Sequence, residues 1–176
     1  EKVKGIDAQL AEVETQYTGL MLGLPNLPDP DLKAGGKENN KVIHPAIYPT
    51  EGPLLMGEVV RKVSEATEHK AILVTDVGQN QMFACRYFKY SQNRSIVTSG
   101  GCGTMGFGLP AAMGATFGAP DRTVCMFCGD GGLQMTIQEL GTIMEQQAPV
   151  KIILLNNDYL GNVRQWQYMF YNKRYS

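Results

Sequence analysis

The sequence predicts an α/β domain in which a parallel sheet is covered by helices on both faces. From about residue 54 onward, apolar runs of strand length alternate with segments of helical periodicity. Glycines and polar residues follow each apolar run, as is typical of the carboxyl ends of parallel strands. The first 44 residues lack this alternation, so we expect a helical arm and a Pro/Gly-rich linker before the domain.

The predicted elements of the domain follow one another along the chain. An amphipathic helix is expected over residues 54–67, with Leu55, Val59, Val63 and Ala66 on its buried side. Apolar runs predict four strands, at residues 71–76, 95–99, 122–130 and 150–157. Helices are expected between and after them, at residues 79–88, 109–119, 133–147 and from about 160.

The residues before this domain form two different segments. Apolar residues from Val3 to Leu24 recur at a 3-4 spacing, which predicts an amphipathic helical arm over residues 1–24. Prolines at 25, 28 and 30 end the helix and favour extended structure, so residues 25–44 are interpreted as a linker. The domain itself would then occupy residues 45–176, and we expect it to be incomplete at its carboxyl end.

Charge and cysteine content narrow the class of protein. The formal net charge of −1 gives no excess of positive charge, so we expect neither nucleic acid nor an anionic membrane as a partner. The first residues lack the apolar core of a signal peptide, which favours a cytoplasmic location and free thiols. Cys125 and Cys128 lie in an expected strand and would point to opposite faces, so we interpret them as core residues.

Two polar clusters at strand ends belong together. Asp130 and Asn157 are 27 residues apart. A helix of about 15 residues and a strand of about 6 residues each span roughly 20 Å, so the chain returns to the edge where it started. A carboxylate and an amide oxygen there form half of a Mg²⁺ site. Gly131 and Gly132 would allow a phosphate to approach the backbone, and the helix expected from about Leu133 would direct its N–H groups at it.

These clusters, GDG and NN, match a known fingerprint. GDG alone is common in ordinary turns, but the pair on a strand–helix–strand frame is the thiamine diphosphate fingerprint, so the expected fold is a thiamine diphosphate-binding fold. Further stretches match one family in order and spacing: TSGGCGTMGFGLPAA, CGDGGLQMTIQEL and LNNDYLGNVRQWQ. Residues 45–176 thereby resemble the thiamine diphosphate-binding domain of acetolactate synthase large subunits.

The resemblance implies an activity and its cofactors. It implies a transferase that condenses two 2-oxo acids, pyruvate with pyruvate or 2-oxobutyrate, with loss of CO₂ in branched-chain amino acid biosynthesis. Thiamine diphosphate and Mg²⁺ would be the cofactors, and the intact family enzyme also holds FAD on a domain that we expect this chain to lack. We expect a homo-oligomer whose site is shared with the partner subunit's N-terminal domain, and a regulatory small subunit as a further partner. The glutamate that activates the cofactor would come from that domain, so the chain alone should be inactive.

The resemblance also assigns roles to residues. Asp130, Asn157 and the backbone carbonyl of Tyr159 would bind Mg²⁺. The diphosphate would be cradled by Gly78, Gln79, Asn80, Gly131 and Gly132. Gly103 and Met105 would orient the cofactor, the first by accepting a hydrogen bond from the aminopyrimidine and the second by wedging under it; Gly161 would also contact it.

Three positions call for comment within this resemblance. Trp166 resembles the tryptophan that shapes the pocket for the second substrate, and the alternative interpretation is a core aromatic. Asn80 stands where many relatives have His, and Cys102 where Leu is usual. Neither departure should abolish cofactor binding.

Other interpretations stay open at this point. Residues 1–40 resemble the tRNA-binding arm and linker of seryl-transfer RNA synthetases, without that family's catalytic motifs. This resemblance would make the chain a fusion, a chimera or a mis-assembled sequence, and the alternative interpretation is an unrelated helix and linker. A second hypothesis is a non-catalytic binding or assembly module that uses the 1–24 helix. A nicotinamide-binding domain is disfavoured because the GCGTMG motif at 101–106 follows the second expected strand, not the first.

Overall fold

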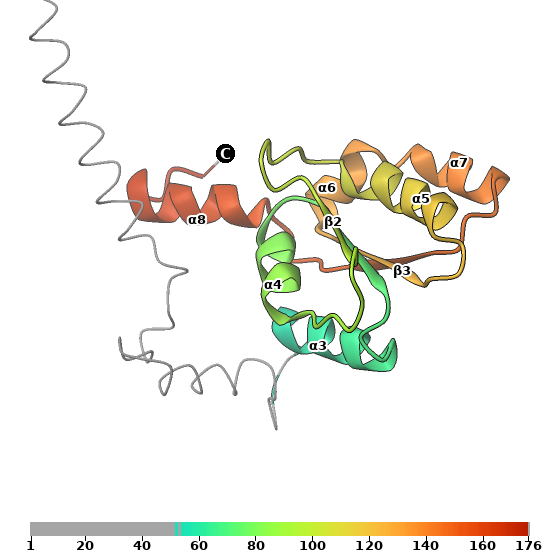
Figure 1. The fold of residues 1–176 in the computed structure, drawn as a ribbon. Coiled ribbons are helices and arrows are strands. Elements are labelled where there is room, and N and C mark those ends of the chain that lie inside the picture. Colours follow the sequence, from blue (N-terminus) through green and yellow to red (C-terminus); the bar gives the residue numbers. More distant parts are fainter. Residues whose placement is uncertain (1–51, 53, 176) are drawn as a thin grey trace, which may run out of the picture. The chain divides into compact units, whose positions relative to one another are not determined.

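The computed structural model describes residue 52 and residues 54–175. Its centre is a four-stranded parallel sheet in the order β2-β1-β3-β4 (Figure 1). The strands are β1 (Ile72–Thr75), β2 (Ile96–Thr98), β3 (Val124–Cys128) and β4 (Val150–Leu154). The expected arm and linker lie outside the described residues, as does the resemblance found in residues 1–40.

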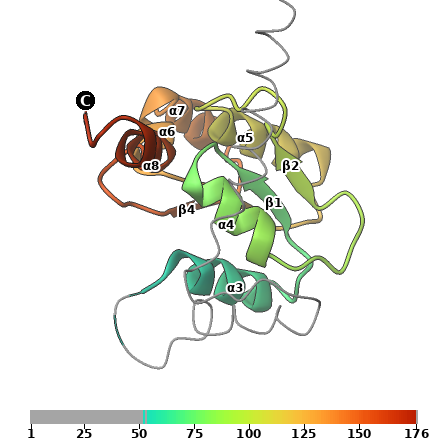
Figure 2. The same ribbon diagram turned by 90° about the vertical axis from the view of Figure 1, so that its left-hand side faces the viewer.

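Helices cover the sheet on both faces, as the sequence predicts. Helices α3 (Met56–Ala66) and α4 (Gln79–Tyr87) pack on one face. The other face is covered by α5 (Gly108–Gly118), α6 (Asp130–Met135) and α7 (Glu139–Glu145). Figure 2 shows the strands between α3 below and α5 and α7 above. None of the helices in the described part of the chain is long and apolar enough to cross a membrane.

The two inner strands divide their side chains between two cores. Every residue of β1 and β3 is buried. Val74 and Met126 belong to the core under α5, whereas Leu73 and Phe127 belong to the core under α3 and α4. Cys128 lies in the first core and Cys125 in the second, so the prediction that this cysteine pair is two core residues is confirmed.

The buried side of α3 differs from the prediction. Leu55 and Ala66 are exposed, while Val59 and Val63 are only partly buried against the core. The innermost positions are Val60 and Ser64. Ser64 is buried because its hydroxyl has polar partners: Oγ accepts a hydrogen bond from the Lys89 backbone N–H at 3.0 Å and lies 2.8 Å from His69 Nδ1. A pattern search for apolar residues alone cannot find such a position.

The expected continuous helix over residues 133–147 is wrong. The chain forms α6 and α7, separated at Thr136 to Gln138. Across the break the backbone bonds are of the i+3 type, such as Glu139 N–H to the Thr136 carbonyl at 2.9 Å. The Thr136 hydroxyl donates to the Gly106 carbonyl at 2.9 Å, so a tertiary contact holds the interruption in place. The first helix also begins at Asp130 rather than Leu133.

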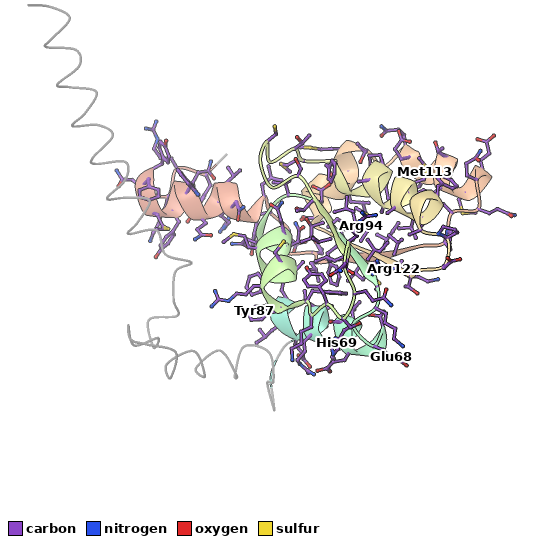
Figure 3. All side chains as sticks on the ribbon, in the orientation of Figure 1. Glu68, His69, Tyr87, Arg94, Met113 and Arg122 are labelled. Atoms are coloured by element: carbon purple, nitrogen blue, oxygen red, sulfur yellow. The ribbon has the colours of Figure 1, made fainter. Side chains whose placement is uncertain are left out.

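The amino edge of the sheet is tied together by one arginine. Arg122, which precedes β3, donates hydrogen bonds to the Lys70 carbonyl at 2.7 Å and to the Arg94 carbonyl at 3.2 Å. Figure 3 labels Arg122 and Arg94, which lie close together. Because Arg122 fills the amino edge, a ligand site is expected at the opposite edge, where the carboxyl ends of the strands lie.

The strand order places a crossover at that carboxyl edge. From β1 the chain moves to β2 on one side and then crosses back to β3 on the other. The loops that leave β1 and β3 therefore diverge around a crevice between the two strands. Ligands of open α/β sheets bind at such a switch point.

Candidate cofactor site

A cavity of about 190 Å³ lies at this switch point. Its walls come from the loops after β1, β3 and β4, from the turn before α5, and from the start of α8 (Gly161–Phe170). All the residues for which a cofactor or metal role is expected line it: Gly78, Gln79, Asn80, Gly103, Met105, Asp130, Gly131, Gly132, Asn157, Tyr159 and Gly161. The exception among the expected site residues is Trp166.

Asp130 and Asn157 reach the cavity from neighbouring parallel strands. Cys128 pairs with Leu154 at the ends of β3 and β4, two and three residues before them, as the spacing predicts. The Asn157 amide donates to Gln79 Oε1 at 3.3 Å, and its Oδ1 accepts a hydrogen bond from the Tyr159 backbone N–H at 3.4 Å. The loop between β4 and α8 therefore faces the loop after β1.

The charge of the lining is unusual for a phosphate site. Asp130 is the one acidic residue on the cavity wall, and no Lys, Arg or His from the described residues lines it. A diphosphate there would need a cation from solution to offset its charge. No group of three His, Cys, Asp or Glu side chains within the described ranges could hold a metal by itself. A hard cation such as Mg²⁺ fits, because it takes few protein oxygens and completes its shell with phosphate and water.

Two glycines leave room at the floor of the cavity. A Cβ atom at Gly132 would collide with the carboxylate of Asp76, and one at Gly131 would collide with the Leu160 side chain. A side chain at Gly132 would therefore displace the buried Asp76 carboxylate, and one at Gly131 would require the Leu160 side chain to move. The backbone of the GDG segment lies directly against the cavity, where an anionic ligand could contact its N–H groups.

Two buried amide oxygens on the cavity wall have no hydrogen-bond partner. They are Oδ1 of Asn80 and Oδ1 of Asn162. Leaving a buried polar group unpaired costs about 1–3 kcal/mol, so such groups mark places where a ligand or water is expected. Rotating the Asn80 amide by 180° would present its N–H₂ group to a phosphate oxygen instead. In that orientation the Asn80 amide, like the glycine backbone of the GDG segment, could donate to an anionic ligand.

The turn before α5 forms the other end of the cavity. Gly103 and Met105 lie on it and line the cavity. The Met105 methyl group lies 3.9 Å from the position that a Cβ of Gly131 would take, so the methionine reaches across to the GDG segment. Gly161, at the start of α8, packs against the Gln79 side chain.

Trp166 lies away from the cavity. It is on α8, a helix with no buried residue, and its side chain is 45% exposed. Its ring contacts Phe170 with the centroids 5.4 Å apart. Within the described residues, Trp166 therefore lies neither in a hydrophobic core nor on the wall of this cavity, and its role in a substrate pocket stays a prediction.

Sequence reasoning missed several residues at this site. Asp76 was not identified as a site residue, although it is completely buried beneath the cavity. Asn162 and Leu160 were not singled out. An acidic residue at the end of a buried strand, two residues before a glycine, is the signal that could have identified Asp76.

A doubly wound sheet with a glycine-lined cavity of this kind is typical of proteins that bind a phosphorylated cofactor. Residues 76–176 match the family model described as thiamine pyrophosphate enzyme, C-terminal TPP binding domain. The chain belongs to this family of thiamine enzymes.

Its most similar curated relatives include several acetolactate synthases. The chain is 46% identical over 138 residues to the acetolactate synthase large subunit of Lactococcus lactis subsp. lactis (strain IL1403), covering 78% of this chain and 24% of that protein. It is 48% identical over 132 residues to acetolactate synthase 1, chloroplastic, of Nicotiana tabacum, covering 74% and 20%. The chain thus spans about a quarter of the length of these relatives.

A solved structure shares the fold. It is the Rhodococcus jostii RHA1 thiamine diphosphate-dependent 4-hydroxybenzoylformate decarboxylase, with a TM-score of 0.64 and 29% identity. The match covers 72% of this chain and 24% of that one. None of these matches tests the resemblance of residues 1–40 to the arm of seryl-transfer RNA synthetases. That resemblance stays a prediction.

Proposed function

We propose that this chain is the thiamine diphosphate-binding part of an acetolactate synthase large subunit. The enzyme would condense pyruvate with pyruvate or 2-oxobutyrate and release CO₂, in branched-chain amino acid biosynthesis. The observation that carries the proposal is the cavity at the switch point, with one carboxylate, unpaired buried amides and a glycine floor. The identity of the relatives supports the reaction.

The residues on the cavity wall divide between the parts of the cofactor. Oxygens of Asp130, Asn157 and the Tyr159 backbone would bind Mg²⁺. The diphosphate would lie against Gly78, Gln79, Asn80, Gly131 and Gly132. Gly103 and Met105 would hold the ring end, with Gly161 beside the diphosphate. When bound, thiamine diphosphate supplies the electron sink that the decarboxylation of a 2-oxo acid needs.

Removal of the Asp130 carboxylate tests this assignment. In calorimetry, Asp130→Ala should weaken binding of thiamine diphosphate in the presence of Mg²⁺ by about 100-fold or more, since even residues behind a metal ligand are worth about 10–100-fold. Asp121→Ala is a matched control, because Asp121 is an exposed acid in the turn before β3, at the amino edge. Equal affinity in Asp130→Ala and in the unaltered chain, or binding that ignores Mg²⁺, would show that the assignment is wrong.

Turnover should need more than this chain. Among the described residues Asp130 is the one carboxylate at the cavity, and it is assigned to the metal. Glu58 is bound to Lys62 on α3, and Glu139 does not line the cavity. The activating glutamate would come from the N-terminal domain of a partner subunit in a homo-oligomer. We therefore expect no acetolactate from pyruvate when the 176-residue chain is assayed alone with thiamine diphosphate, Mg²⁺ and FAD.

The remaining parts of the proposal concern the whole enzyme. Several relatives from bacteria carry the name large subunit, which supports a regulatory small subunit as a partner. FAD would bind on another domain of the large subunit. We also propose a cytoplasmic location for the enzyme, although two relatives from Nicotiana tabacum are named chloroplastic. Trp166 would contact the second 2-oxo acid only where elements outside the described residues complete that pocket.

A further inference from the structure

A carboxylate with no solvent exposure lies beneath the candidate site. Asp76 follows β1 and is 0% exposed. Its Oδ1 accepts hydrogen bonds from the Val77 N–H at 2.7 Å and the Gly106 N–H at 3.1 Å. Its Oδ2 accepts one from the Gly108 N–H at 2.9 Å. Of the two distant donors, Gly106 belongs to the turn before α5 and Gly108 is the first residue of that helix, so this side chain connects the end of β1 to the turn and to the start of α5.

Backbone groups, not a basic side chain, offset the buried charge of Asp76. None of the ion pairs among residues 54–175 includes it. A buried carboxylate is tolerated when its lone pairs are filled by N–H donors, and such charge-assisted bonds are stronger than neutral ones. The same carboxylate also faces Gly132, where a Cβ would collide with it. Asp76 therefore contacts three walls of the cavity from below.

Gly106 is held from its other side by Thr136. The Thr136 hydroxyl donates to the Gly106 carbonyl at 2.9 Å, while the Gly106 N–H is held by Asp76. Gly106 has φ of +84°, and a Cβ there would lie 3.0 Å from Thr136 Cγ2. Glycine is needed both for the backbone angle and for the close approach. Asp76 and Thr136 together form what we call the Gly106 clamp.

The clamp lies next to the residues expected at the ring end of the cofactor. Met105 directly precedes Gly106, and Gly103 lies on the same turn. Farther from the clamp, the turn is held by local bonds, from the Gly103 N–H to the Ser99 carbonyl and from the Thr104 N–H to Ser99 Oγ. The distance between the ring end and the diphosphate end of the cavity therefore depends on the clamp.

We propose that Asp76 and Thr136 are positioning residues for thiamine diphosphate. They hold Gly103 and Met105 at the distance from the Gly78 and Gly132 loops at which ring and diphosphate bind together. This inference rests on the proposed function. It goes beyond it in assigning a cofactor-directed role to a buried acid and to the threonine at the α6–α7 break, neither of which needs to touch the cofactor.

A pair of substitutions at Thr136 tests the clamp with little risk to the fold. Thr136→Val removes the hydroxyl and keeps the shape, whereas Thr136→Ser keeps the hydroxyl. Calorimetry would measure two probes, each with Mg²⁺: thiamine diphosphate, which spans both ends of the cavity, and inorganic pyrophosphate, which needs only one. We expect Thr136→Val to bind thiamine diphosphate about fivefold more weakly, as for one lost hydrogen bond, and pyrophosphate as the unaltered chain does. Thr136→Ser should bind both probes normally.

Asp76→Asn gives a larger, independent effect. The amide can fill only one of the two oxygen positions with an acceptor, so one donor of the turn would face an N–H₂ group. Affinity for thiamine diphosphate should fall by about 10-fold to 100-fold, since hydrogen bonds to charged groups are the stronger class. Circular dichroism would establish that the variant is folded before it is compared.

The outcomes separate this inference from the proposed function. If Thr136→Val binds thiamine diphosphate normally, or loses affinity for both probes alike, the positioning role is overturned while the proposed function stands. If the unaltered chain binds neither probe with Mg²⁺, the proposed function fails and this inference fails with it. A selective loss for thiamine diphosphate in Thr136→Val, restored in Thr136→Ser, supports the clamp.

Discussion

The two sides of the cofactor cavity are built from very different parts of the sheet. On one side the loops follow β1 and β3, in which every residue is buried. On the other side the chain leaves β4, where Lys151, Ile152 and Leu154 are exposed, and enters α8, which has no buried residue. Figure 1 shows α8 extending away from the sheet. We call the loops after β1 and β3 the inner wall of the cavity, because they leave fully buried strands. We call the segment from β4 to α8 the outer wall, because β4 has exposed residues and α8 has no buried residue.

This difference in burial predicts that the two walls differ in rigidity. The Asp76 carboxylate and the two hydrophobic cores hold the inner wall. The outer wall is linked to the inner one by polar side chains, with Gln79 accepting from Asn157 and donating to Gln165, both at 3.3 Å. Regions with few buried apolar contacts open at low free-energy cost. We expect the inner wall to be preorganised and the outer wall to adjust when a ligand binds.

The largest loss of stability is expected from a substitution that removes a large side chain from the core behind the inner wall. Phe127 is completely buried on β3 and packs edge-on against Phe88, with ring centroids 6.2 Å apart. Phe127→Ala should lower the free energy of unfolding by about 3–5 kcal/mol in urea titrations followed by circular dichroism. Phe117→Ala is the matched control, because Phe117 on α5 is 56% exposed. Similar losses in the two variants would contradict the division into core and surface walls.

The stability of the protein should depend on pH through Cys128, which is buried in the core behind the inner wall. Burial, with the Asp76 charge as a second cause, raises the pKa of the Cys128 thiol to about 12. In the unfolded chain the thiol ionises near its ordinary value of 9.0, so between pH 9 and 12 the unfolded state loses a proton that the folded state keeps. Stability should therefore fall as the pH rises through this window, with no contribution from Cys128 below it.

A substitution separates this contribution from general alkaline unfolding. Cys128→Val removes the titrating group and keeps an apolar side chain of similar size. The urea midpoint of the unaltered chain should drop more steeply than that of the variant as the pH rises above 9 towards 12. Parallel declines in the two proteins would mean that Cys128 ionises as easily in the folded state as in the unfolded one.

Much of the fold was predictable from local patterns, and the failures have tertiary causes. The alternation of apolar runs and helices located all four strands. β1 and β3 are apolar, apart from Thr75, because both of their faces are buried, while β2 and β4 are partly exposed but still mostly apolar. The 133–147 segment has helical periodicity, but Thr136 bonds to Gly106, thirty residues away, and the helix breaks there. The buried face of α3 was misjudged because Ser64 is satisfied by Lys89, a partner that periodicity cannot show.

The site was predictable to the extent that its residues follow strand ends. The GDG and NN segments were located from spacing, because parallel strands place their carboxyl ends at one edge. The role of Asp76 could not be predicted from the sequence, because it depends on a backbone N–H donor from a turn 30 residues later in the chain. Trp166 was expected in a pocket on the strength of a family resemblance. In the described residues its ring is 45% exposed, on a helix with no buried residue.

The smallest effect is expected at the outer wall. The Trp166 side chain on α8 is 45% exposed, and its ring contacts that of Phe170 on the same helix. An isolated aromatic pair at the surface is worth about 0.5–1.5 kcal/mol, and a helix without buried residues transmits little of that to global unfolding. Trp166→Ala should therefore lower the free energy of unfolding by at most about 1 kcal/mol. Because Trp166 is the single tryptophan of the chain, circular dichroism has to replace fluorescence as the probe. A loss near that of Phe127→Ala would mean that α8 folds as part of the core, and the contrast between the two walls would disappear.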